Sequence, residues 1–432
     1  MSDVFIEPNS LEEKSYCKKH NIILSRFDNG IVLVGINCYK EFSAFTEMNF
    51  EFQEGAFGNK IGAVHLLEHL LHKKLFEYSS INNINLGAYT TYFTVVLTLE
   101  GISNPKIKDF GIWPVLEKTK ETLFNAPIMS NKNEKEMQSE IQVIKAEIKE
   151  KENNYNFEAA KNFSKFMFAK NNPLHDISAI AGDEKSLEKI KIKDLVKVHE
   201  KITSYTDLII SFYSLGKLTI QKQIYSYCEN LFLRLPNRKK NVFKVDKSIL
   251  EEINPDAKPG VFRHYPSKIS KDIAVYYFSW IIDLDTYSRA YFAVNMLSII
   301  ISRVLHKYSR TKGWGYTDYS SFKNLYLKKQ IFSIVVISKK GNQSPTKADI
   351  RKIFELTKKE IPDFILQERK RQLATPIDVY DRFSWIKGGI GEFGAIINID
   401  KIRKTKISLS EKDYYSIFDK ITSVEPIVVV TG

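Results

Sequence analysis

The stretch Gly62-Ala63-Val64-His65-Leu66-Leu67-Glu68-His69 decides how this 432-residue chain is interpreted. Residues four apart in an α-helix lie on one face, so His65 and His69 can direct two imidazoles at one point. Glu68 projects close to the same face. Two imidazoles suit zinc, and a neighbouring carboxylate can accept a proton from a water held there. The alternative is a pair of structural histidines on an apolar helix.

A charged helix is predicted from Asn133 to about Asn153, and it offers a third ligand. Its apolar residues keep a 4-3-4 spacing that turns one face inward: Met137, Ile141, Ile144 and Ile148. Glu140 and Glu147 are seven residues apart and border this apolar face. A buried carboxylate needs a partner, so Glu147 is the candidate third ligand. From the helix alone, an ordinary solvated carboxylate is nearly as well supported.

The length of the chain predicts two domains. It exceeds the roughly 250–300 residues at which a single hydrophobic core stops growing. A polar segment rich in proline and glycine, from Pro236 to Gly260, marks the junction. The predicted organisation is therefore a first domain at 1–240, a linker at 241–262 and a second domain at 263–432.

Charge and cysteine content restrict the function classes. The formal net charge of +13 comes from 64 basic and 51 acidic residues spread along the chain. No nucleic-acid-binding motif accompanies it, so nucleic acid is not an expected partner, and binding to an anionic surface is a remote alternative. The three cysteines, Cys17, Cys38 and Cys228, form no paired framework, which favours a reducing compartment. No signal peptide and no long apolar run are present, so we expect no membrane span and a cytoplasmic location.

The pattern of elements predicts an α+β fold with two related domains. Each domain is expected to hold a largely antiparallel β-sheet packed against helices. The first half offers a hairpin through Asp28-Asn29-Gly30 and a single long strand at Tyr89–Glu100. The second half repeats the order as a strand, a long helix, a strand, two helices and a closing strand: Ile273–Trp280, Tyr287–Tyr308, Ile331–Ile337, Lys347–Ile361, Asp363–Leu373 and Pro426–Thr431. Its only histidines are His264 and His306, so only the first domain is expected to bind metal.

Several motifs, in order along the chain, resemble those of the insulinase-like zinc metallopeptidases, the family of mitochondrial processing peptidase. The order His-x-x-Glu-His is the signature called inverzincin. The motifs are Phe27-Asp28-Asn29-Gly30-Ile31, the Gly62 to His69 stretch, the pair Glu140 and Glu147, the turn Gly182 to Lys185, and Arg310 to Tyr316. The resemblance covers almost the whole chain and implies the fold of the processing peptidases.

Two features depart from the family pattern. Family members carry Asn-Ala-x-Thr on the edge strand beside the metal, whereas this chain has Gly87-Ala88-Tyr89-Thr90. The interval from Arg310 to Tyr316 is also one residue shorter than in the family. A substrate contact at Gly87 and the joint role of Arg310 and Tyr316 are therefore in question.

The resemblance implies a zinc-dependent endopeptidase that binds one zinc ion per chain through His65, His69 and Glu147. Glu68 would be the general base. Glu140 would orient a ligand histidine, and the alternative for it is an ion-paired carboxylate at the edge of the core. Arg310 and Tyr316 would hold the substrate or stabilise the oxyanion. The strand carrying Gly87, Ala88, Tyr89 and Thr90 would take the peptide as an added β-strand: this is the expected substrate-binding segment.

The family builds a closed chamber from four domains, and this chain supplies two. The resemblance therefore implies two chains, with Arg310 and Tyr316 acting on the zinc site of the partner. A homodimer suffices, and a heterodimer with an inactive homologue is the other possibility. The substrates would be short or unfolded peptides, and one version of the function is maturation of a specific precursor peptide. The alternative function is that of a non-catalytic recognition or structural subunit of a processing peptidase.

Overall fold

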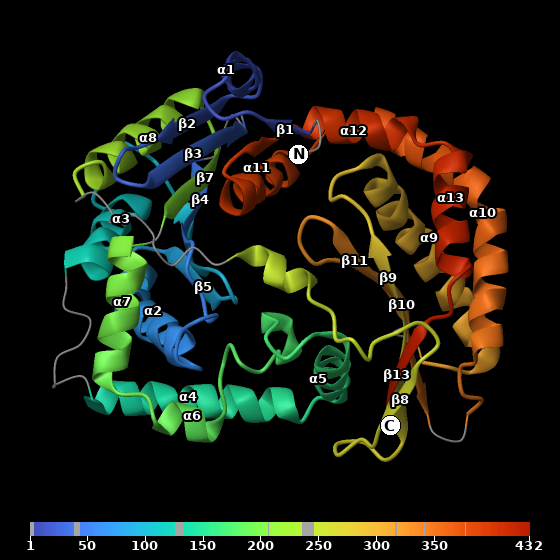
Figure 1. Ribbon diagram of the computed structural model, residues 1–432. Helices are drawn as coiled ribbons and strands as arrows, with labels where there is room; N and C mark the ends of the chain where they lie inside the picture. The colour runs from blue at the N-terminus through green and yellow to red at the C-terminus, as the bar shows by residue number, and fades with distance from the viewer. Residues whose placement is uncertain are drawn as a thin grey trace.

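The computed structural model contains two large β-sheets that stand side by side, with most helices on their outer faces (Figure 1). The structure describes residues 4–38, 44–125, 134–205, 207–235, 246–315, 318–339, 342–375 and 377–432.

The first sheet has six strands, and the parallel pair β3 and β7 is its only departure from an antiparallel arrangement. In spatial order the strands are β2 (Ile22–Arg26), β3 (Ile31–Cys38), β7 (Leu208–Leu215), β4 (Phe45–Phe52), β6 (Val95–Ile102) and β5 (Ile84–Thr90). The predicted hairpin through Asp28-Asn29-Gly30 joins β2 to β3, with Gly30 at a φ of 79°. Strand β5 lies at one edge and pairs only with β6 among the described strands.

The second sheet repeats this arrangement in five strands. Their order is β10 (Tyr319–Asn324), β11 (Lys329–Lys339), β9 (Ile273–Asp283), β13 (Ile427–Thr431) and β8 (Phe262–Tyr265). Only β8 and β13 are parallel, and they occupy the place that β3 and β7 hold in the first sheet. The predicted α+β class, with two related and largely antiparallel sheets, is confirmed.

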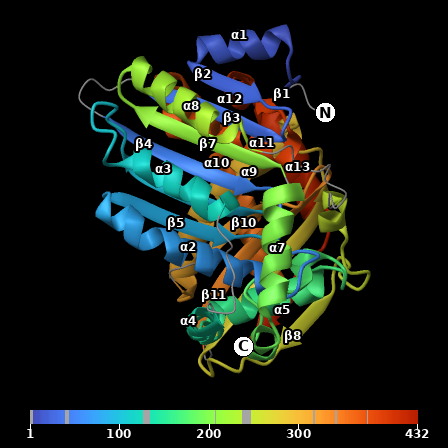
Figure 2. The same cartoon turned by 90° about the vertical axis from the view of Figure 1, so that its left-hand side faces the viewer.

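Helices lie on both faces of the sheets, most of them on the outer faces. Those of the first half are α1 (Leu11–Lys19), α2 (Ala63–Ile81), α3 (Ile112–Lys120) with the π-helix Glu121–Asn125, α4 (Glu134–Glu152), α5 (Tyr155–Met167), α6 (Glu184–Glu188), α7 (Ile192–Tyr205) and α8 (Leu218–Phe232). Those of the second are α9 (Arg289–Lys312), α10 (Lys347–Ala374), α11 (Val379–Phe393), α12 (Ile399–Ser408) and α13 (Glu411–Thr422), and the short 3-10 turns η3 (Pro173–His175) and η4 (Lys247–Glu251) precede them. Seen from the side, α2, α3, α7 and α8 lie across the first sheet (Figure 2).

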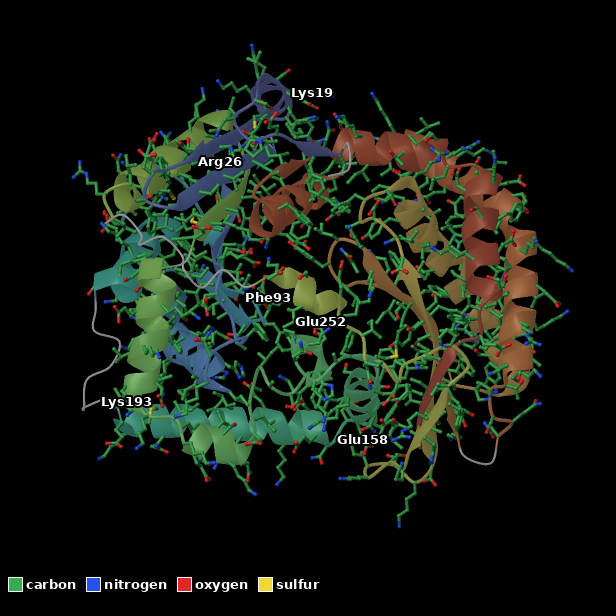
Figure 3. All side chains as sticks on the ribbon, viewed as in Figure 1. Lys19, Arg26, Phe93, Glu158, Lys193 and Glu252 are labelled. Atoms are coloured by element: carbon green, nitrogen blue, oxygen red, sulfur yellow. The ribbon has the colours of Figure 1, made fainter. Side chains whose placement is uncertain are left out.

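One helix of each half packs against the sheet of the other half. Helix α5, from the first half, buries Ala159 and Phe166 in a core with Val275 and Val429 of the second sheet. Phe163 of α5 also stacks on Tyr277 at a centroid distance of 4.5 Å. Its Glu158 accepts hydrogen bonds from the hydroxyl of Ser267 and the amide of Lys268, and Figure 3 shows it beside the second sheet.

Helix α11 makes the reverse exchange. Its Phe383, Ile386 and Ile390 pack on Val34 and Ile209 of the first sheet. The short strand β1 (Phe5–Ile6) pairs with β12 (Ile396–Ile397), which joins the N-terminal segment to the second half of the chain. The two halves therefore share their inner cores, and the predicted domain boundaries at 240 and 263 stay predictions.

Two predicted elements are wrong in form. The expected single strand Tyr89–Glu100 is a hairpin, because β5 ends at Thr90 and β6 begins at Val95. The Thr91 hydroxyl accepts hydrogen bonds from the backbone amides of Phe93 and Thr94, and these bonds close a tight turn between β5 and β6. The two helices expected at Lys347–Ile361 and Asp363–Leu373 are one helix, α10, which continues through Pro362.

Candidate metal centre

Helix α2, which carries His65, Glu68 and His69, begins where only glycine fits. Gly62, at its N-terminus, has a φ of 78°, in the left-handed region. A Cβ added there would lie 2.8 Å from Leu187 Cδ2 and 3.0 Å from the Ala181 carbonyl oxygen. The helix therefore starts close against the 181–187 segment and then runs along β5. This placement buries His65 and Glu68 while His69 keeps some exposure.

The imidazoles of His65 and His69 converge. Their Nε2 atoms are 3.2 Å apart, and the ring planes are nearly perpendicular at 85°. Two nitrogens at zinc-bonding distances of about 2.0–2.1 Å in a tetrahedral shell would be separated by about 3.3 Å. Burial, followed by the nearby His69 and Lys151, lowers the pKa of His65 to about 4, which keeps this imidazole neutral. Two imidazoles at this spacing fit a zinc ion.

Glu147 brings a carboxylate to the same point from helix α4. Its Oε1 lies 3.5 Å from His69 Nε2 and its Oε2 lies 3.9 Å from His65 Nε2. The side chain is 38% exposed, so one side of the carboxylate faces the solvent. Met137, Ile141, Ile144 and Ile148 of α4 are buried against α2, as the spacing predicts. The structure thus brings together the three residues expected to hold a metal.

Glu68 is the second carboxylate at this point. It is 6% exposed, and its Oε2 is 3.9 Å from His65 Nε2. The hydroxyl of Thr90 donates a hydrogen bond of 2.8 Å to this same oxygen. Burial raises the pKa of Glu68, and the Thr90 hydrogen bond partly offsets that rise. Ligand atoms of His65, Glu68 and His69 lie within 4.8 Å of one another, so Glu68 is also near enough to ligate. Because the Thr90 hydroxyl already holds Oε2 of Glu68, we expect Glu147 to be the third ligand and Glu68 the base.

Glu140 lies behind His69. Its Oε2 is 3.5 Å from His69 Nδ1, and its Oε1 accepts a 2.7 Å hydrogen bond from Lys73 Nζ. A carboxylate on Nδ1 favours the tautomer in which Nε2 carries the free lone pair. Both alternatives considered for Glu140, orientation of a histidine and an ion pair, are therefore present in one group.

A cavity of about 690 Å³ opens beside the cluster. Its wall includes Ala88, Tyr89 and Thr90 on the edge strand β5, and charged side chains at Lys151 and Glu152. Strand β5 pairs with β6 on one side, and no other described strand pairs with its second edge, where an added strand could bind. Gly87 lies in the same strand, and a Cβ built on it meets only Thr98 Cβ at 3.7 Å, an ordinary contact.

The second group of predicted residues lies elsewhere. Arg310 is in the last turn of α9, in the other half of the molecule, and does not line this cavity. Tyr316 lies outside the described residues. Sequence reasoning missed Lys73 and Lys151, which follow His69 and Glu147 by four residues each, so helical spacing alone could have found them. It also missed that Thr90 contacts Glu68, which no spacing rule encodes.

Part of the chain matches a known protein family. Residues 189–373 match the family described as the peptidase M16 inactive domain. This matched segment starts after Glu147 and so contains none of His65, Glu68, His69 and Glu147. No curated protein matches the sequence.

Solved structures share the fold over nearly the whole chain. A peptidase M16 inactive domain from Pseudomonas fluorescens is 14% identical, with a TM-score of 0.72, over 95% of this chain and 98% of that one. A protease from Helicobacter pylori is 13% identical, with a TM-score of 0.73, over 95% and 99%. The periplasmic protease PqqL from Escherichia coli is 11% identical, with a TM-score of 0.67, over 95% of this chain but only 47% of its own. At these identities the likeness establishes an M16-like fold.

Within the described ranges, no helix is both long enough and apolar enough to cross a bilayer. The expected absence of a membrane-spanning helix agrees with this finding. Since one protein of the same fold is periplasmic, the cytoplasmic location stays a prediction.

Proposed function

We propose that the protein is a zinc-dependent endopeptidase acting on short or unfolded peptides, with one zinc ion per chain held by His65, His69 and Glu147. The observation that carries this proposal is the 3.2 Å approach of the two imidazole Nε2 atoms, with the Glu147 carboxylate 3.5 and 3.9 Å away. When bound, zinc lowers the pKa of water from 15.7 to about 7 and polarises a carbonyl.

The remaining steps belong to side chains of the protein. The peptide adds to the open edge of β5 through backbone hydrogen bonds, so its sequence matters little for affinity along the strand. Glu68 accepts a proton from water as the water oxygen attacks the peptide carbonyl carbon. It then gives that proton to the leaving nitrogen as the C–N bond breaks. Glu140 holds His69 in the tautomer that this arrangement needs.

A second chain would complete the site. The match covers only 47% of the PqqL chain, which is therefore about twice as long as this one. Two copies of this chain together are about as long as one PqqL chain. In such a dimer Arg310 and Tyr316 of one copy act at the metal centre of the other. A homodimer is the simpler form, and a heterodimer with an inactive homologue is the other.

The experiment compares zinc content and cleavage of quenched peptides in the wild type and in Glu68→Gln. We expect one zinc per chain in both proteins, with cleavage at least about 100-fold slower in the variant because general base catalysis is lost. Glu77→Gln, an exposed change on the same helix, is the matched control and keeps full activity.

The second candidate function is a non-catalytic subunit, which the match of residues 189–373 to an inactive domain favours. It predicts a wild type that binds no zinc or cleaves no peptide by itself, or a mixture with a catalytic homologue whose cleavage rate is the same for the wild type and for Glu68→Gln. Either result would overturn the enzyme proposal.

A further inference from the structure

We infer that Thr90 is a positioning residue for the Glu68 carboxylate, in addition to its place on the substrate-binding strand. This inference rests on the proposed function, since it assigns a partner to the general base of that site. The distance between Thr90 Oγ1 and Glu68 Oε2 is 2.8 Å, and Glu68 is 6% exposed. A buried carboxylate with this hydroxyl as donor has one oxygen fixed and the other left for the proton transfer.

The hydroxyl is held rigidly because the chain on both sides of it is fixed. Thr90 is the last residue of β5 and is paired with Val95 of β6. Directly after it, the Thr91 amide donates to the Thr94 carbonyl at 2.8 Å and closes the hairpin. The Thr91 hydroxyl lies 2.8 Å from that of Thr94, which tightens the turn further.

The same turn is bonded to the segment that leads into the helix of Glu68. The amide of Ala56 donates to the Thr91 carbonyl at 3.0 Å, and the amide of Phe57 donates to the Tyr92 carbonyl at 2.9 Å. Five residues after Phe57, Gly62 starts α2. Phe93, at the tip of the hairpin, lies near the centre of the molecule (Figure 3). The base and its hydrogen-bond donor are therefore braced against each other by one continuous set of backbone bonds.

These backbone bonds help to distinguish the roles of the two carboxylates, Glu68 and Glu147, as general base and metal ligand. Glu68 and Glu147 are both within 4 Å of an imidazole nitrogen, and Glu68 also accepts a hydrogen bond from Thr90 of strand β5. The hydroxyl keeps Glu68 Oε2 on the β5 side of the site. A substrate strand that pairs with β5 would then lie next to a general base whose position is fixed by Thr90 of β5.

The test uses Thr90→Val and Thr90→Ser in the full-length, zinc-loaded protein. Thr90→Val keeps the shape of the side chain but removes the donor, so we expect kcat to fall about 10- to 100-fold with KM changed less than threefold. Thr90→Ser restores the donor and should recover most of the kcat. Zinc content and the thermal unfolding midpoint are measured for both, and zinc content should stay at one per chain.

Thr98→Val is the matched control, because it removes a threonine hydroxyl that donates to Asn49 on the neighbouring strand, 2.9 Å away. It should leave kcat unchanged. A rise in KM with kcat preserved in Thr90→Val would make Thr90 a substrate-binding residue only and overturn the inference. Equal losses in Thr90→Val and Thr90→Ser would overturn it as well. Failure of the proposed function itself would appear earlier, as an inactive wild type or an active Glu68→Gln.

Discussion

At the scale of single residues, the candidate site depends on which atoms face each other. The sequence predicted that His65, His69 and Glu147 would meet, and the three side chains do approach one point. Helical spacing explains the pair of histidines, because it is a local property. The prediction that Glu147 joins them depended on the family resemblance. Glu147 lies 78 positions after His69, and no local spacing rule predicts that two such distant residues are close in space.

Gly87 offers a test of the departure from the family pattern. Its Cβ position has only one ordinary neighbour, Thr98 Cβ at 3.7 Å, and its backbone is in a regular strand. We therefore expect Gly87→Asn to fold with a change of less than about 1 kcal/mol in the free energy of unfolding. The restored amide should lower KM for peptides severalfold, because it adds a hydrogen-bonding group beside the edge of β5.

Steady-state kinetics and denaturant unfolding check this expectation. Gly87→Ala separates the effect of the amide from that of losing a glycine. If Gly87→Asn and Gly87→Ala bind peptide equally well, the amide at this position makes no contact with the substrate.

At the scale of elements, the end of α9 near Arg310 is tied to the start of α10. Asp349 is the centre of this tie. Its Oδ1 accepts from Tyr308 and Lys312, each at 2.9 Å, and its Oδ2 accepts from the amide and hydroxyl of Thr346. Burial alone would raise the pKa of Asp349, but these hydrogen bonds outweigh burial and lower the pKa to about 2.

A depressed pKa in the folded state makes stability depend on acidity. The unfolded value of an aspartate is about 3.9, so the Asp349 contribution is fully present above about pH 4–5 and is lost as the pH falls towards 2. We expect Asp349→Asn to lower the free energy of unfolding by about 2 kcal/mol at pH 7. The difference from the wild type should shrink as the pH falls below 4. Urea unfolding of both proteins at several pH values measures it, and a difference that does not vary with pH would contradict the assignment.

Elements were predictable where the pattern was local. The hairpin through Asn29-Gly30 and helix α4 appear as their sequences indicate. The β5–β6 hairpin was missed because Thr91 to Thr94 contains no glycine, proline or asparagine, and its turn depends on threonine hydroxyls. Helix α11 was missed because glycine is a poor helix former, yet Gly391 allows close packing: a Cβ there would lie 2.8 Å from Glu51 Oε1.

At the scale of the whole molecule, the exchange of α5 and α11 could not be predicted from sequence. Nothing in their amphipathic patterns says which sheet they cover. A model with two contiguous domains assigns each covering helix to the sheet of its own half. The structure instead places α5 on β9 and β13, and α11 on β3 and β7.

This exchange predicts how fragments behave. A fragment of residues 1–240 lacks α11 and leaves Val34 and Ile209 exposed, whereas one of residues 246–432 lacks α5 and leaves Val429 exposed. Each fragment should bind hydrophobic dyes and unfold without a cooperative transition, while the two fragments mixed should recover a sharp transition. Circular dichroism and calorimetry of each fragment alone and of the mixture measure this. A fragment that folds cooperatively by itself would contradict the prediction.

The helix that completes the first sheet has a consequence for synthesis on the ribosome. Domains usually fold in turn as the chain emerges, at about 5–20 residues per second. Here one face of the N-terminal sheet stays uncovered until residues 379–393 have been made, and strand β1 waits for its partner at Ile396–Ile397. The nascent chain must therefore remain incompletely packed for most of its translation, and its early sheet is the surface on which we expect chaperones to act.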